Sequence, residues 1–212
     1  MNRIKRVSAM LLVLCMIFAL AACGSRKPTA DDAEKYVKAV LDILCTGDYD
    51  HSVKLVDADE LENVVSDAID EVLDEMSDSI ELTDEVKDSF RDVMLDMLAK
   101  SKYTVGDAVE VEGGFDVPVT IEPLDLEASI DAAGEKVAES IMTDPDIENL
   151  TENELINKVI LAVIDELKVE LDDPTYKEGT EVTVRFEELE DGVYGVNEAG
   201  GEELGKALFG MN

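Results

Sequence analysis

The chain has 212 residues, a length that suits one domain with at most a short appendage. Its 18 basic residues stand against 51 acidic ones, which gives a formal net charge of -33 at pH 7. This charge excludes nucleic acid as a natural partner, because phosphate binding needs a basic face, and it disfavours electrostatic docking on anionic lipid. Hydrophobic residues make up 46% of the chain, so we expect a folded core.

The first 22 residues have the features of a bacterial export signal. Basic residues stand within the first six positions, and an apolar run that is short for a membrane span then continues to Leu20. The run ends in Leu20-Ala21-Ala22-Cys23-Gly24, which closely resembles the lipobox of bacterial lipoproteins. That resemblance implies cleavage before Cys23 and acyl chains on its sulfur, which would hold the protein on the extracytoplasmic face of the cell membrane. The alternative is an ordinary secretory signal that happens to contain Cys23.

The cysteines argue against a disulfide within the processed chain. Cys15 would leave with the leader and Cys23 would carry lipid, so Cys45 alone would remain. Cys45 ends an apolar helical stripe, which favours a small buried side chain over a nucleophilic thiol. This stripe comprises Val37, Val40, Leu41 and Leu44. The leader holds three basic residues and no acidic ones, so its loss would change the net charge from -33 to -36.

Helical periodicity covers much of the chain that follows. Apolar residues recur every three or four positions, and capping boxes at Asp31 and Thr151 mark two of the helix starts. The predicted helices cover residues 31–46, 52–56, 59–76, 84–100, 126–142 and 152–171, with a short last helix near Leu204. Because apolar residues surround much of the segment 152–171, we expect that helix to be the most buried.

Two stretches show the two-residue alternation of half-buried strands. One hairpin covers residues 103–121 and turns at Gly113-Gly114, and the other covers residues 182–196 and turns at Asp191-Gly192. Pro118 in the first hairpin indicates an edge strand or a bulge. The order of helices, hairpin, helices and hairpin predicts an α+β fold, in which N-terminal helices and a long central helical segment pack on a small antiparallel sheet of two hairpins.

Three segments follow from these patterns. Residues 1–22 are the predicted signal peptide, residues 23–30 the lipidated cysteine and a tether, and residues 31–212 a single α+β domain. The segment Ala33–Val40, followed by Gly47-Asp48-Tyr49, resembles the first helix of Gram-positive cell-surface lipoproteins that carry a nuclear transport factor two-like, or cystatin-like, domain. The last strand, with Tyr194 where such proteins usually have tryptophan, is similar as well. The resemblance implies a cone-shaped fold, often of unknown function, although the helical stretch 125–171 is longer than in the simple version.

Few residues in the sequence suggest a catalytic or metal-binding site. His51, in a polar loop, is the chain's one histidine and is expected to be solvated; zinc is improbable with so few nitrogen and sulfur ligands. The loop that starts at Asp144 does not match an EF-hand calcium site. Asn149 stands where the EF-hand loop requires glycine, and Leu155 stands where it requires glutamate. We therefore predict no catalytic, cofactor-binding or metal-binding residue. A carboxylate–tyrosine site of the ketosteroid isomerase kind leaves little linear signature, and Tyr103 and Tyr194 would be its candidates.

One stretch of the chain contains acidic residues but no basic ones. From Leu55 to Val86 there are thirteen acidic residues and no lysine or arginine. Several of them recur every three or four positions and so share one helix side, where they repel each other. These are Asp67, Asp70, Glu71, Asp74, Glu75 and Asp78. A solvated face is the simplest interpretation, and diffuse divalent-cation binding or a basic partner are the alternatives.

The leading hypothesis is a lipid-anchored extracytoplasmic binding or interaction module without catalytic activity. Its partners would be the membrane, through acyl chains on Cys23, and a protein or small apolar ligand. The alternatives are a small-molecule enzyme or carrier that uses an apolar pocket of the sheet, and a divalent-cation-responsive surface protein. No cofactor is expected under the leading hypothesis.

The excess of acidic side chains predicts a fold that added salt stabilises. Thermal melts should shift upward from dilute buffer to sodium chloride, because ions screen the repulsion. Calcium chloride at matched ionic strength should give the same shift, since no acidic cluster has a complete ligand pattern. A larger shift with calcium at micromolar to millimolar concentration would instead show a specific site.

Overall fold

The computed structural model describes residues 20–21, 27–46, 58–77, 80–143, 149–190 and 192–210. The described helices are α2 (Ala30–Thr46), α3 (Ala58–Ser77), α4 (Asp84–Ala99), α5 (Leu126–Thr143), α6 (Glu152–Glu170) and α7 (Glu198–Leu208). The described strands are β1 (Leu20–Ala21), β2 (Lys102–Val105), β3 (Val109–Val111), β4 (Gly114–Glu122), β5 (Thr180–Glu190) and β6 (Val193–Val196). The predicted helix over residues 52–56, Cys23 and His51 lie outside the described residues.

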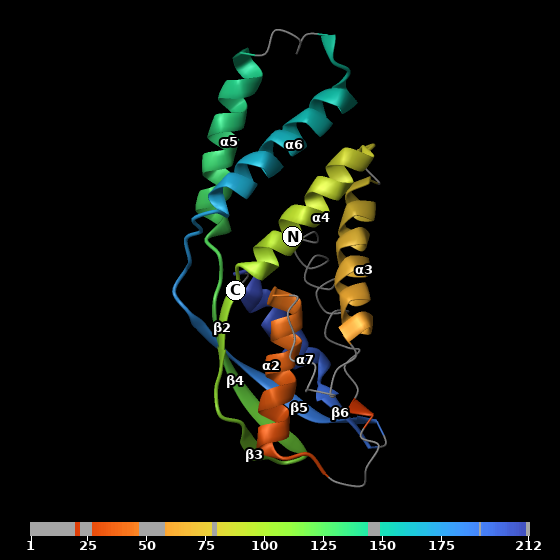
Figure 1. Cartoon of the computed structure of the whole chain (residues 1–212), viewed down its shortest axis with the longest axis vertical. Helices are drawn as coiled ribbons and strands as arrows, with labels where there is room; N and C mark the ends of the chain where they lie inside the picture. Colours follow the sequence, from red (N-terminus) through yellow and green to blue (C-terminus); the bar gives the residue numbers. More distant parts are fainter. Residues whose placement is uncertain are drawn as a thin grey trace.

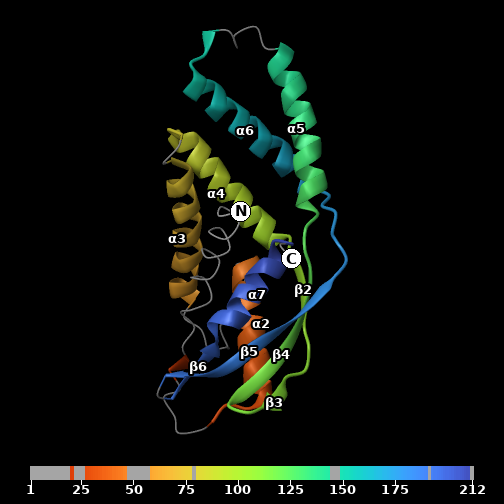
Figure 2. The same cartoon turned by 180° about the vertical axis from the view of Figure 1, so that it is seen from behind.

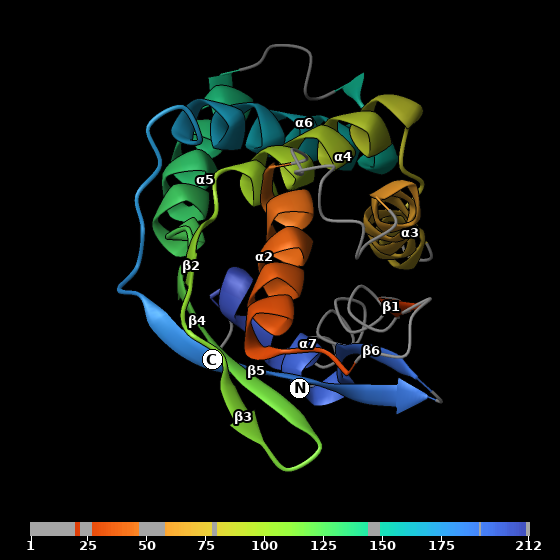
Figure 3. The same ribbon diagram turned by 60° about the horizontal axis from the view of Figure 1, so that its bottom comes forward.

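The predicted α+β class is confirmed. The strands form one curled antiparallel sheet in the order β1-β6-β5-β4-β2, and β3 also pairs with β4. Helix α2 lies along the inner face of this half-barrel, with α7 beside it on the same face (Figure 3). Helices α4, α5 and α6 gather at the other end of the elongated molecule, and α3 stands beside α4 (Figures 1 and 2).

The main core lies between α2 and the sheet, where the strand alternation places it. On β4 the residues Phe115, Val117, Val119 and Ile121 are buried, while the residues between them are only half-buried. Val117 pairs with Val184 of β5, and both are fully buried. Tyr36 of α2 packs its ring against Phe186, with ring centroids 5.1 Å apart. The inner face of the sheet is therefore covered by α2 and α7 and does not stand open as a pocket.

Pro118 lies in a central strand, contrary to the edge position that its presence suggested. Strand β4 has β5 on one side and β2 with β3 on the other. The carbonyl oxygen of Pro118 accepts a hydrogen bond from the Gly106 amide at 2.8 Å, so the missing N–H of proline faces the gap between β2 and β3. The pairing moves from Val105 with Val119 to Val109 with Asp116, which leaves one extra residue on the β2–β3 side. An irregular ladder of this kind accommodates a proline.

The expectation that the segment 152–171 forms the most buried helix is wrong. In α6 only Asn157 and Ile164 are buried among the helical residues, whereas α2 buries nine. Helix α6 packs on α4 and α5 at one end of the molecule, where its half-buried Ile160 and Leu161 pack against the margin of the main core. Most of its other apolar side chains are half-buried and Val169 is 58% exposed, so the described residues leave part of its apolar surface uncovered.

Asn157 is the buried polar group that fixes α6 in place. Its Oδ1 accepts a hydrogen bond from the Thr83 amide at 2.9 Å, and its Nδ2 donates to the Glu81 carbonyl at 2.8 Å. Thr83 is the N-cap of α4 and accepts from the Val86 amide. The buried amide therefore satisfies backbone groups just before α4 while it joins this helix to α6.

Strand β1 falls within the predicted signal peptide. Leu20 pairs with Tyr194 and Ala21 with Val193, at the edge of β6. If the leader is cleaved before Cys23, the processed chain keeps the other strands and β6 becomes an edge of the sheet.

Two glycines provide a matched test of the sheet packing. A Cβ on Gly114 would lie 2.2 Å from the Phe186 carbonyl oxygen, whereas a Cβ on Gly134 of α5 would meet nothing within 4 Å. We expect Gly114→Ala to lower the free energy of unfolding by more than about 2 kcal/mol, because two strand backbones must separate. Gly134→Ala should raise it by about 0.5–1 kcal/mol through helix propensity. Urea unfolding of both variants measures the difference; equal effects would contradict the close approach of β4 and β5.

Candidate functional site

An apolar cavity lies between α4 and α6. It has a volume of about 290 Å³ and is partly open to solvent. Every lining side chain is apolar, and methionine is prominent among them. The lining residues are Met76, Phe90, Val93, Met94, Met97, Ile130, Val159, Ile160, Val163, Ile164 and Leu167. We call this space the α4–α6 cavity.

Helical periodicity builds both walls of the cavity. On α4 the lining residues Phe90, Val93, Met94 and Met97 repeat every three or four positions, and five residues of α6 do the same. Beneath the cavity, Val93 and Ile164 belong to a second, smaller core. The sequence predicted both stripes but treated them as interior, because a pattern shows which side of a helix is apolar and not what covers it. Thioether side chains adapt to differently shaped partners, so these walls suit binding.

A second cavity, of about 440 Å³, lies among α2, α3 and α4. Cys45, Arg91 and Asp96 are among its lining residues. The Cys45 side chain is 1% exposed, and burial, with a smaller contribution from Asp42, raises the pKa of its thiol to about 12. The thiol is therefore protonated at neutral pH and is a poor nucleophile, in agreement with its predicted place on a buried stripe.

Tyr103, one of the two candidate tyrosines, joins β2 to α2. Its hydroxyl donates a hydrogen bond to Asp42 Oδ1, and Lys38 Nζ lies 2.8 Å and 2.6 Å from the two carboxylate oxygens of Asp42. Burial and then the Asp42 carboxylate raise the pKa of the Tyr103 phenol above its ordinary value of about 10. This phenol stays neutral, and it lines neither cavity.

Tyr194, the other candidate, packs on the sheet core. Its ring stacks on Phe186 with centroids 6.2 Å apart, and its hydroxyl donates to Glu188 at 3.4 Å in an exposed position. Phe186 in turn contacts Tyr36 of α2. The two candidate tyrosines thus bond to different carboxylates, and Tyr194 also lines neither cavity.

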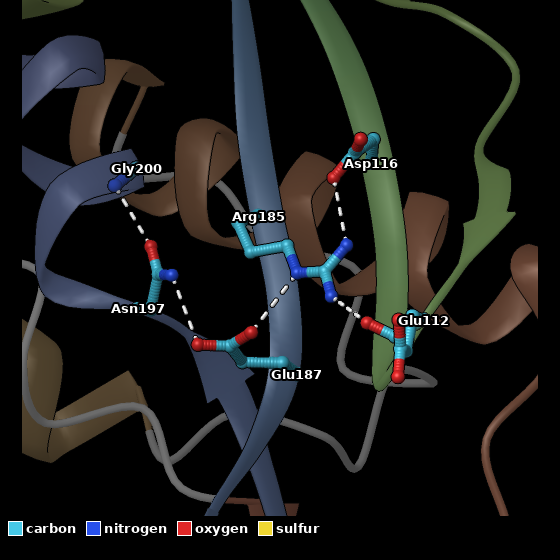
Figure 4. Close-up of polar contacts among 6 residues, drawn as sticks. All are labelled: Glu112, Asp116, Arg185, Glu187, Asn197 and Gly200. Carbon is cyan, nitrogen blue, oxygen red and sulfur yellow. Dashed lines mark hydrogen bonds and ion pairs between the residues drawn. The ribbon is translucent and has the colours of Figure 1, made fainter.

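The outer face of the sheet carries a polar cluster centred on Arg185 (Figure 4). Arg185 donates to Asp116 at 3.0 Å, to Glu187 at 2.9 Å and to the Glu112 carbonyl. Asn197 donates to Glu187 at 2.9 Å. The guanidinium and then the Asn197 amide lower the pKa of the Glu187 carboxyl.

The Arg185 cluster connects β4, β5 and the start of α7. Asp116 of β4 and Arg185 of β5 are register partners. Asn197 caps α7 by accepting a hydrogen bond from the Gly200 amide at 2.9 Å. Two carboxylates already pair with the positive charge of Arg185. We therefore interpret the cluster as a structural contact that joins the two hairpins.

No group of three or more potential metal ligands is close enough to hold an ion within the residues that the structure describes. The loop at residues 144–148 lies outside them. On α3 the acidic side chains of Asp67, Glu71, Asp74 and Glu75 are exposed. Asp70 accepts a hydrogen bond from Arg91 Nε at 2.7 Å. Each helix in the described part of the chain is too short or too polar to cross a bilayer.

Comparison with solved structures finds a protein of similar fold. No protein-family model matches the sequence, and no curated protein does. The crystal structure of YcdA, a proposed lipoprotein from Bacillus subtilis, is similar with a TM-score of 0.63. The match has 16% identity and covers 84% of this chain and 56% of that one. The similarity is one of fold. It places the α+β architecture described above among those already seen in solved proteins.

The Tyr103 hydroxyl should contribute to stability while that of Tyr194 should not. We expect Tyr103→Phe to lower the free energy of unfolding by about 1–2 kcal/mol, because a half-buried hydrogen bond to a carboxylate is lost. Tyr194→Phe keeps its ring stack and should change it by less than about 0.5 kcal/mol. Urea unfolding at pH 7 measures both.

The pH dependence of Tyr103→Phe gives a second test. A phenol whose pKa is higher in the folded than in the unfolded protein stabilises the fold below about pH 10, and this contribution is lost as the pH rises further. The parent protein should therefore lose stability more steeply above pH 10 than Tyr103→Phe does. Parallel curves would contradict the raised pKa of this phenol.

Proposed function

We propose that the protein is a lipid-anchored, extracytoplasmic binding module without catalytic activity. The lipobox-like segment that ends at Cys23 supports the anchor, and YcdA, a proposed lipoprotein, shares the fold. A helix lying across a curled antiparallel sheet also supports the resemblance to nuclear transport factor two-like, or cystatin-like, domains. That more specific assignment is part of the proposal.

The α4–α6 cavity is the observation that carries the binding role. Its lining includes no side chain that could act as acid, base or nucleophile. A space with wholly apolar walls can bind an apolar group, but it offers nothing to stabilise a developing charge. Catalysis at the candidate tyrosines is disfavoured because neither lines this cavity.

The fold would direct this cavity away from the membrane. Helix α2 starts at the end of the molecule where β3 lies, and the pair α5 and α6 forms the opposite end (Figures 1 and 2). The proposed anchor, Cys23, precedes Ala30 by seven residues, which reach at most about 25 Å when fully extended. The sheet end would then face the membrane, and the α4–α6 cavity would face outward to meet a partner.

A small-molecule carrier is the second candidate function. The α4–α6 cavity has about the volume of the smallest ligand pockets, which begin near 300 Å³. The carrier role was first expected to use the inner face of the sheet, but α2 and α7 cover that face. A carrier would therefore use the space between the helices.

The anchor is tested by two cysteine variants in a bacterial host that lipidates its own lipoproteins. Cys23→Ala should abolish incorporation of a labelled fatty acid and leave the protein released or unprocessed, because no sulfur accepts the acyl chains. Cys15→Ala, within the leader, should be lipidated and processed like the parent. Fatty-acid labelling with cell fractionation measures both; a Cys23→Ala protein that is labelled and anchored like the parent would refute the lipoprotein assignment.

A further inference from the structure

We propose that the outer edge of β6, once the leader is removed, binds an extended apolar strand of another protein, which would add to the sheet in the place of β1. Figure 3 shows β1 beside β6 at this edge. The inference rests on the proposed cleavage before Cys23 and goes beyond the binding role of the α4–α6 cavity. It identifies a second interaction surface, which would recognise its partner through backbone hydrogen bonds.

The structure shows a strand seated on this edge. Leu20 pairs with Tyr194 in an antiparallel ladder. Ala21 pairs with Val193 in the same ladder, and β6 has β5 on its other side. Both leader residues precede Cys23, so cleavage there would remove them from the chain. Among the described residues that would remain, none pairs with β6 on this side, which leaves the edge open to another strand.

Backbone alternation determines which groups this edge presents. The Asn197 amide donates a hydrogen bond to the Arg185 carbonyl at 3.0 Å, so the backbone of residue 197 faces β5. Successive residues of an antiparallel strand turn their N–H and C=O groups to opposite sides. The backbone groups of Tyr194 and Val196 therefore point away from β5, toward the position of β1. Without β1 they have no strand partner in the described part of the chain, and such unpaired backbone groups are a template for strand addition.

The opposite edge of the sheet is less suited to strand addition. There β2 carries Lys102, β3 carries Glu110, and the pairing with β4 shifts between these two strands. Charged side chains and irregular pairing both discourage a further strand. Strand β6 (Val193–Val196) contains no charged residue and no proline. Of the two edges, that of β6 is therefore the one suited to accept a strand.

Charge and sequence specify the chemistry of the partner strand. The segment seen on the edge is apolar, and β6 offers it no charged side chain. Glu188, the β5 neighbour of Tyr194, is exposed and would repel an acidic strand. A second copy of the processed chain would bring a net charge of -36, which is -33 without the three basic residues of the leader, and this charge opposes pairing of two β6 edges. The observations favour an apolar segment of a different protein that lacks acidic residues.

The experiment uses the processed, lipidated protein in phosphatidylcholine nanodiscs, with empty nanodiscs as the blank. Intact mass spectrometry first establishes that the leader is absent. The probe is a fluorescein-labelled peptide with the sequence of residues 17–22, joined to a polyethylene glycol chain for solubility. Fluorescence anisotropy should show binding with a dissociation constant of roughly 1–100 μM, because a short strand forms few main-chain hydrogen bonds.

Two N-methylated peptides test whether the backbone is what binds. In the register of β1, the amide of the leucine that corresponds to Leu20 points to Tyr194, and the amide of the next alanine points away. Methylation of the leucine amide should weaken binding at least about tenfold, because a main-chain hydrogen bond is lost and a methyl group enters the interface. Methylation of the alanine amide, the matched control, should weaken it less than about twofold. Equal effects would overturn the proposal.

Disulfide trapping tests the register by a different measurement. A peptide with a glutathionylated cysteine in place of Ala21 should exchange with the thiol of Val193→Cys, because these positions are register partners. Thr104→Cys, exposed on β2 at the opposite edge, is the control, and Cys45 is buried and stays unreactive. Relative to reaction with oxidised glutathione, trapping should be at least about fivefold faster at position 193 than at position 104. Urea unfolding checks that both variants keep the stability of the parent; equal rates would overturn the proposed register.

The outcomes separate this inference from the proposed function. If the processed protein binds the peptide no better than the blank does, the β6 edge is not a docking site, while the anchor and the α4–α6 cavity stand. If Val193→Cys links to a second copy without peptide and Thr104→Cys does not, the edge pairs two copies and the proposal of a different partner fails. If mass spectrometry shows that the leader is retained, β6 keeps its strand, and the inference fails together with the proposed lipid anchor.

Discussion

The packing of α2 into the curled sheet is the contact on which the rest of the structure depends. Tyr36, Val37 and Leu41 are essentially fully buried and belong to the same core as Val117 and Phe186 of the sheet. Burying side chains of this size contributes roughly 1.5–3 kcal/mol each relative to exposure. Because this helix fills the concave face of the sheet, any space for a ligand must come from elsewhere in the molecule.

The remaining helices are organised by this constraint. With the sheet covered by α2 and α7, α4 and α6 pack against each other at the far end and form a second, smaller core. Few of the described elements surround this second core, so within the described part of the chain α6 keeps apolar side chains that are only partly covered. The net charge of -33 predicts repulsion among the carboxylates, which would weaken the folded state at low salt.

Local sequence patterns were sufficient to predict the main helices and strands. The stripe along Val37 and Leu41 predicted α2, and the alternation through Phe115 and Val119 predicted β4, because both periods follow directly from backbone geometry. The α+β class followed from the order of these elements. The interruption that separates β2 from β3 was not predicted, since it depends on how the strand beside Pro118 is paired.

Contacts between distant residues account for most of what the sequence did not show. Tyr103 was identified as a candidate, but its partner Asp42 is 61 positions away and lies on another element. The role of Asn157 was missed, because a lone amide in an apolar helix carries no signal of the loop it will meet. The apolar character of α6 was recognised, but the sequence could not tell a side that the core buries from one that stays half-exposed.

The burial of Cys45 would protect its thiol at the proposed extracytoplasmic location. At the proposed location the surroundings are oxidising, and an accessible thiol there would form mixed disulfides or link two copies covalently. Oxidants react with the thiolate, and a pKa of about 12 leaves almost none of it at neutral pH. The packing of α2 thus protects the thiol as well as the fold, so Cys45 should remain reduced when redox conditions change.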